Sequence, residues 1–119
     1  MITEDYVSFE TAKLLKERGF DEMTELAYGL ENGQVRADLP VSYWRNSEIG
    51  DYRFSCPTLQ MAMKWLREVH KITIGIVFKG DRIYYEIHQN NEFVFGVDTP
   101  KSYEEVCDEA IKHCLKNLI

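Results

Sequence analysis

The segment from Ser102 to Ile119 most constrains the fold, because three independent helix signals coincide in it. Ser102 and Glu105 have the spacing of a capping box, in which each side chain bonds to the backbone of the other residue. Apolar residues then recur every three or four positions: Tyr103, Val106, Cys107, Ala110, Ile111, Cys114, Leu115 and Leu118. The other side is charged, acidic at the start and basic near the end, as the helix dipole favours. The sequence therefore predicts a helix over 102–119 with one buried face.

The first half of the chain predicts a helix, a hairpin and a connection. Ser8 and Gly19 bracket a helix over 9–18, since serine caps helix starts and glycine commonly follows helix ends. Asn32 and Gly33 lie between two β-prone segments, 24–30 and 34–39, and this dipeptide favours a tight hairpin turn. Residues 40–56 show no sustained period and contain several turn residues, which predicts a long surface connection.

The second half predicts a helix followed by three strands and the last helix. Pro57 suits the first turn of a helix with a wide apolar face. Alternating apolar residues then predict strands 72–78, 83–88 and 93–97 in an antiparallel meander. The side chains expected to face the last helix are Ile74, Ile76, Tyr85, Ile87 and Phe95. The whole order is helix, β-hairpin, helix, three-stranded meander, helix, which predicts a single α+β domain over 1–119 with helices packed on one face of the sheet.

Composition indicates the cellular location of the protein and the state of its cysteines. The chain has 119 residues and a net charge of −6, with no apolar run of the roughly 20 residues that cross a bilayer and no secretory signal at its start. We therefore expect a cytoplasmic protein without a membrane span. Three cysteines cannot all pair internally, and Cys107 and Cys114 share the apolar face of the last helix. Both are expected to be buried and reduced.

Few residues offer chemistry. Glu86 and His88 share one strand face, which is reasonable geometry for a general acid and base and is equally typical of a solvated sheet face. If Pro57 opens a helix, Cys56 lies at its amino end, where the dipole lowers a thiol pKa. No ligand spacing typical of metal sites occurs, so neither a metal nor a cofactor is expected.

Two resemblances add context. The order helix, three strands, helix over 57–119 resembles the double-stranded-RNA-binding domain, which carries a basic cluster at the start of its final helix. This chain departs from that pattern, because Lys101 is followed there by Glu104, Glu105, Asp108 and Glu109. The segments DYVSFETAKLLKERGFDE, CPTLQMAMKWLREVHKI and YEEVCDEAIKHCLKNLI resemble small uncharacterised proteins of prophages and mobile elements in Bacteroides-type bacteria. That resemblance implies an accessory protein of a mobile element and no catalytic residues.

The leading hypothesis is a non-enzymatic protein-interaction module that binds another protein or itself. Aromatic and methionine side chains are enriched at interface cores, and the candidate interaction surface comprises Tyr43, Trp44, Met61 and Trp65. The same four side chains are equally consistent with a place in the core of the monomer. The alternative is nucleic-acid binding through a basic face on the second helix, although the acidic flanks oppose it. Its candidate basic patch comprises Lys64, Arg67, Lys71, Lys79 and Arg82. A third hypothesis is a small hydrolase or redox protein centred on Cys56.

Overall fold

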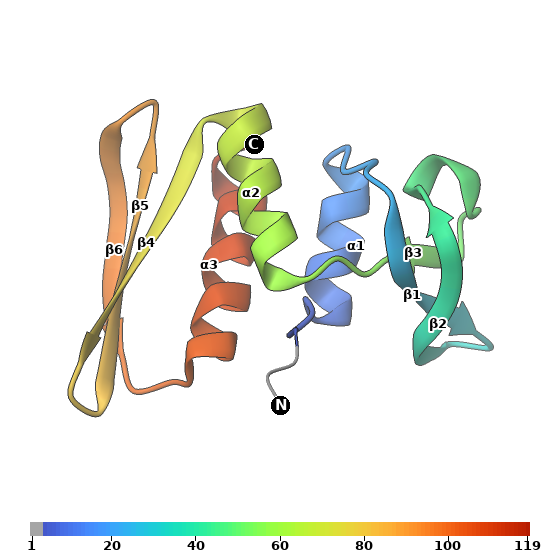
Figure 1. Cartoon of the computed structure of the whole chain (residues 1–119), viewed down its shortest axis with the longest axis horizontal. Coiled ribbons are helices and arrows are strands. Elements are labelled where there is room, and N and C mark those ends of the chain that lie inside the picture. Colours follow the sequence, from blue (N-terminus) through green and yellow to red (C-terminus); the bar gives the residue numbers. More distant parts are fainter. Residues whose placement is uncertain (1–3) are drawn as a thin grey trace. The chain divides into compact units, whose positions relative to one another are not determined.

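The computed structural model describes the backbone of residues 4–119 and the side chains of residues 4–36 and 45–119. Within these residues the chain forms three α-helices and two three-stranded antiparallel sheets, which confirms the predicted α+β class. It divides into two compact units, Met1–Thr58 and Leu59–Ile119, each with its own sheet (Figure 1). That residues 1–119 form one domain stays a prediction.

The first unit contains a helix and a sheet with the strand order β2-β1-β3. Its elements are α1 (Phe9–Glu17), β1 (Thr24–Glu31), β2 (Gln34–Trp44), the 3₁₀ helix η1 (Asn46–Glu48) and β3 (Arg53–Ser55). The predicted hairpin is confirmed: Glu31 pairs with Gln34, and the turn residues Asn32 and Gly33 have φ angles of 50° and 77°. Two consecutive positive φ angles are the mark of a type I′ turn, whose twist matches that of the strands.

The long surface connection predicted for residues 40–56 is wrong. Strand β2 continues to Trp44 through irregular pairing with β1, and β3 pairs antiparallel with the other edge of β1. Asn46 joins these parts: its amide nitrogen donates to the Phe20 carbonyl at 2.8 Å, and its amide oxygen accepts from the Ser55 N–H at 2.9 Å. The buried amide of Asn46 therefore holds the segment between β2 and β3 in place. No regular alternation of apolar residues marks this segment, so its structure could not be predicted from the sequence.

Helix α1 packs against this sheet through aromatic rings. The Phe9 ring meets those of Tyr28 and Phe54 edge-on, at centroid distances of 5.7 Å and 5.4 Å. Near the end of the helix, the Lys16 ammonium donates to the carbonyls of Gly50 and Arg53. Partial burial lowers the pKa of Lys16, against a smaller opposing effect of Asp51. The lysine thus ties α1 to the segment that leads into β3.

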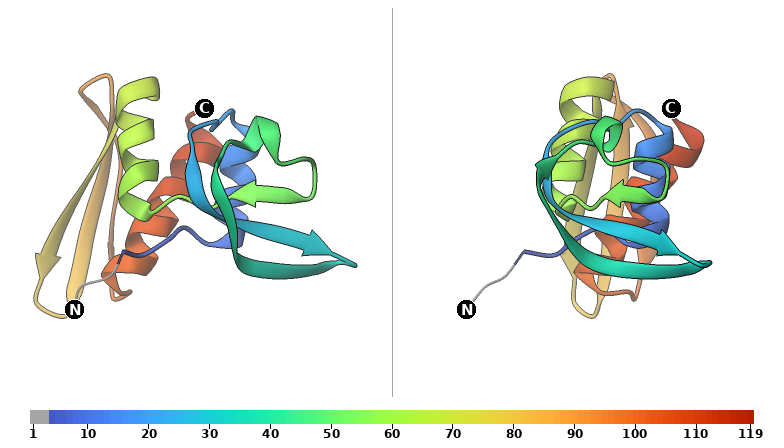
Figure 2. Two further views of the ribbon diagram at one scale, coloured as in Figure 1. Left: turned by 45° about the vertical axis from the view of Figure 1, so that its right-hand side comes forward. Right: turned by 90° about the vertical axis from the view of Figure 1, so that its right-hand side faces the viewer.

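The second unit places two helices on one face of a meander (Figures 1 and 2). Its elements are α2 (Leu59–His70), β4 (Ile72–Lys79), β5 (Arg82–Gln89), β6 (Glu92–Thr99) and α3 (Tyr103–Asn117). The strands pair antiparallel in sequence order, as predicted. The capping box of α3 is also confirmed, since Ser102 Oγ accepts from the Glu105 N–H and the Glu105 carboxylate accepts from the Ser102 N–H.

The two faces of this sheet differ as the alternation predicts. Tyr85 and Ile87 are buried on the helix side, and Phe95 stacks on His113 of α3 with 4.0 Å between ring centroids. Tyr84 and His88, on the other face, are half-exposed. Cys107 and Cys114 are fully buried free thiols, which confirms the prediction made for them.

The predicted start of the second helix needs correction. Helix α2 begins at Leu59, whereas Thr58 forms a β-bridge with Tyr6 and the Pro57 carbonyl accepts from the Val7 N–H at 3.1 Å. Residues 57 and 58 therefore belong to an extended segment. Cys56, which is 2% exposed, precedes the first residue of the helix by three positions and is therefore not its N-cap residue.

Candidate functional site

A groove runs along β4 in the second unit, with a cavity volume of about 440 Å³. We call it the β4 groove. Helix α2 contributes Gln60, Met63 and Arg67 to its lining. Strand β4 contributes Thr73, Ile74, Ile76 and Phe78, and α3 contributes Tyr103. Its floor is formed by apolar β4 side chains, because the helix-facing side of that strand is only partly covered by the helices.

An aromatic pair closes one end of the β4 groove. The Phe78 and Tyr103 rings are stacked at a centroid distance of 5.8 Å, with 12° between their planes. The Tyr103 hydroxyl accepts from the Gln60 amide at 3.2 Å, and burial raises the pKa of this tyrosine. Phe78 is nevertheless 65% exposed. A large apolar ring therefore faces solvent beside a concave surface, which is the composition expected at an interaction site.

A second cavity of about 350 Å³ adjoins the β4 groove, because Arg67 and Thr73 line both. Lys71, Asn90 and Asn91 complete it, and we call it the basic pocket. Local backbone geometry positions these residues: Lys71 has a φ of 59° at the junction of α2 and β4, and its carbonyl accepts from the Asn90 N–H at 3.0 Å. Asn90 and Asn91 form the β5–β6 turn with φ angles of 52° and 67°.

The two cavities have a positive lining in a protein of negative net charge. Arg67 and Lys71 are exposed, and no aspartate or glutamate is among the described residues that line either cavity. Arg67 makes no ion pair in the part of the chain that the structure describes. Among the described residues, the Lys71 ammonium donates to the backbone carbonyl of Glu68, at 3.3 Å. The Arg67 and Lys71 side chains can therefore both bind a carboxylate or phosphate of another molecule.

The predicted interaction surface is only partly described. Tyr43 and Trp44 belong to the backbone of β2, and their side chains lie outside the described residues. Met61 is half-buried. Trp65 is only 7% exposed and packs edge-on against His70 at 4.8 Å, so of the two interpretations the structure places this ring in the core of the folded chain. The wide apolar face of α2 accommodates this ring in the folded chain.

The five residues of the predicted basic patch do not gather at one place. Lys64 and Arg67 are exposed on α2, and Lys71 precedes β4, whereas Lys79 and Arg82 flank the β4–β5 turn at the far end of that strand. The Lys79 ammonium lies 5.0 Å from the centre of the Tyr84 ring.

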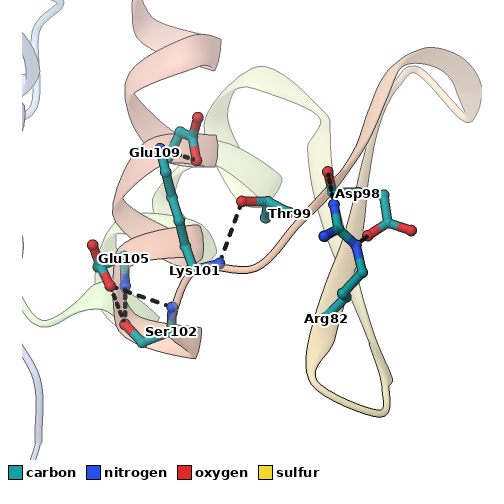
Figure 3. Close-up of polar contacts among 7 residues, drawn as sticks. All are labelled: Arg82, Asp98, Thr99, Lys101, Ser102, Glu105 and Glu109. Carbon is teal, nitrogen blue, oxygen red and sulfur yellow. Dashed lines mark hydrogen bonds and ion pairs between the residues drawn. The ribbon is translucent and has the colours of Figure 1, made fainter.

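Neighbouring carboxylates already neutralise two basic groups near the start of α3 (Figure 3). Arg82 pairs with Asp98 at 2.8 Å, and Lys101 pairs with Glu109 at 3.3 Å. Asp98, together with Glu109 from the acidic start of the last helix, thus engages cations that a phosphate backbone would otherwise contact.

The remaining candidate catalytic residues make ordinary contacts with neighbouring groups. The Tyr84 hydroxyl donates to the Glu86 carboxylate at 3.0 Å, and His88 Nε2 lies 3.9 Å from the same carboxylate, all on the sheet face opposite the helices. Cys56 Sγ lies 3.7 Å from the Val7 carbonyl and is buried. Among residues 4–119, no three metal-ligating side chains gather in one place.

Sequence reasoning missed the β4 groove, although a signal for it exists. The segment Ile72–Phe78 contains no charged residue, and an uncharged strand at a sheet edge is unusual. What the sequence did not supply was the knowledge that β4 is an edge strand. In the described part of the chain, no helix is long and apolar enough to span a membrane. Comparison of the chain with protein-family models, curated proteins and solved structures finds no match.

Proposed function

We propose that this protein is a non-enzymatic protein-interaction module and that its binding site is the β4 groove. The observation that carries the proposal is the combination of a concave, apolar-floored groove with an exposed aromatic ring, Phe78, at its end. Aromatic side chains beside a depression are typical anchors of protein interfaces. That the chain serves a phage or mobile element stays a prediction from the sequence resemblance.

Nucleic-acid binding is the second candidate, and one observation favours it: Lys64 and Arg67 are exposed on the same helix without ion pairs among the described residues. The ion pairs of Arg82 and Lys101 count against it, because phosphate binding would have to displace Asp98 and Glu109. Affinity for a phosphate backbone depends on how many charges are neutralised, and few free cations are available here. We therefore place protein binding first.

Site-specific photo-cross-linking tests the proposed function. A benzophenone amino acid at position 78 should capture one predominant protein in an extract of the source cells. The same group at position 93 is the matched control, since Phe93 is 60% exposed but lies on β6. The product from position 78 should disappear when Ile76→Lys is added, or Met63→Lys if the first variant does not fold. Equal products from both positions, or none from position 78, would contradict the proposal.

A further inference from the structure

We infer that the occupant of the β4 groove is an extended acidic segment of a partner protein, which adds to the sheet as a fourth strand beside β4. Its carboxylates would contact Arg67 and Lys71 in the basic pocket. This inference rests on the proposed function and specifies the chemistry of the partner. Three features support the inference: the free edge of β4, the length of the β4 groove and the positive charge of its lining.

The two edges of the β4–β5–β6 sheet differ in how they resist strand addition. Strand β6 has an irregularity in its pairing with β5 and carries Glu92 and Asp98. Bulges and charges of this kind protect an edge. Strand β4 pairs with β5 over eight residues without a register shift and has no charged residue before Lys79. Because no strand pairs with its other side within residues 4–119, β4 offers an unprotected row of backbone groups.

The exposure of β4 shows that the helices of the second unit leave this strand accessible. Thr73 and Gly75 are exposed, and Val77 and Phe78 are 52% and 65% exposed. An added strand would satisfy the free backbone groups, which gives affinity that does not depend on sequence, while pockets for alternate side chains give specificity. The groove supplies such pockets on the helix side.

The groove and the basic pocket together match a short extended peptide. Residues 73–78 span about 20 Å at the usual strand rise, which corresponds to roughly six residues of a bound strand. Side chains two residues apart in that strand point to the same face. An apolar side chain near Met63 and Ile76 would therefore be followed, two or four residues away, by a carboxylate near Arg67.

Charge selects a carboxylate-bearing partner over a second copy of this chain. If two β4 strands paired antiparallel over residues 72–79, Lys79 of each copy would lie opposite Ile72 of the other, beside Lys71. Like charges placed across an interface are unfavourable. An acidic segment has the opposite effect at both ends of the strand, because Lys71 precedes β4 and Lys79 is its last residue.

The inference is tested with a random 12-residue peptide library panned on the full chain. We expect enriched peptides to contain an apolar residue followed two or four positions later by Asp or Glu. Synthetic fluorescein-labelled copies should bind, and the double variant Arg67→Glu, Lys71→Glu should weaken their binding roughly tenfold, the combined effect of two partly exposed ion pairs. The double variant Lys13→Glu, Lys64→Glu makes the same change in net charge outside the groove and should bind within about twofold of the unchanged chain.

Amide hydrogen exchange locates the bound peptide. Strand addition predicts slower exchange at residues 73–79 and unchanged exchange in β6. Protection elsewhere, or enriched peptides without acidic residues, would overturn the acidic-strand inference, while the cross-linking result from position 78 would still decide the proposed function. A 20-base-pair RNA duplex serves as the nucleic-acid probe. Binding of the duplex at physiological salt that both double variants abolish would overturn the inference in favour of nucleic acid.

Discussion

The hydroxyl of Tyr84 on β5 lies over Gly96 on β6, so close that a β-carbon at position 96 would be 2.6 Å from the hydroxyl oxygen. The Phe93 ring is also near, 3.3 Å from the same point. The tyrosine is fixed there because its hydroxyl donates to Glu86. A β-carbon at position 96 therefore requires the Tyr84 and Phe93 side chains to move.

Gly96→Ala should therefore destabilise the protein relative to Gly75→Ala, by about 1 kcal/mol, because the added methyl group pushes the Tyr84 ring aside and breaks its hydrogen bond to Glu86. Urea denaturation measures the loss. Gly75→Ala is the matched control: its β-carbon would have an ordinary contact of 3.8 Å with Glu86, so stability should stay level or rise slightly. Tyr84→Phe in the Gly96→Ala background should recover part of the loss, and no recovery would mean that the hydroxyl is not the obstacle.

Asn46→Ala should cost about 2 kcal/mol, because it removes the two buried hydrogen bonds of its side-chain amide, to the Phe20 carbonyl and from the Ser55 N–H. Ser47→Ala is the control at the adjacent exposed position: it removes the exposed hydrogen bond from the Ser47 hydroxyl to Asp21 and should cost less than about 1 kcal/mol. Chemical denaturation followed by circular dichroism compares the two. Equal effects would argue against Asn46 as the residue that holds the segment before β3.

The elements of the fold differ in how well the sequence predicts them. The helices, the Asn32-Gly33 turn and the meander were predicted from signals confined to a few neighbouring residues. Strand β3 and the end of β2 were not, because β3 has three residues and depends on β1 and on Asn46, which are distant in sequence. A period of two cannot be recognised over so short a segment.

The candidate site shows the same limit. The pattern of the sequence predicts Arg67 and Lys71 as basic residues of one helix face, and Ile74 and Ile76 on the inner side of a strand. Whether these four residues line one groove depends on which strand forms the sheet edge and on how much of that strand α2 covers. Tertiary packing decides both. The same packing buries Trp65, which the wide apolar face of α2 left open to either interpretation.

Stability should fall at alkaline pH because of two buried groups. Burial raises the pKa of the Cys114 thiol from 9.0 to about 12, and burial followed by the charge of Glu109 raises the pKa of Tyr85 from 10.0 to about 12. Above pH 9 the unfolded chain loses the thiol proton while the folded chain keeps it. The free energy of unfolding should therefore decrease by up to about 1.4 kcal/mol per pH unit for each group.

Urea denaturation at pH 8, 9 and 10 checks this expectation. Tyr85 contributes mainly above pH 10, so Cys114→Ala should remove most of the decrease between pH 9 and 10, whatever its effect on stability at pH 8. A variant that retains the full decrease would show that the thiol is not its source.

Lys71→Gly should raise stability and lower peptide affinity at the same time. Lys71 has a φ of 59°, a conformation that is unfavourable for residues with a β-carbon by roughly 1 kcal/mol and that glycine adopts freely. Lys64→Gly, at a regular position within α2, is the matched control and should lower stability by about 1 kcal/mol. Both variants remove one positive charge, but only Lys71 lines the basic pocket, so only its replacement should weaken binding of acidic peptides from the library. Opposite shifts in melting temperature, together with a loss of affinity confined to Lys71→Gly, would indicate that Lys71 contributes to peptide binding at the cost of an unfavourable backbone conformation. Equal affinities of the two variants would mean that the basic pocket does not receive the carboxylate.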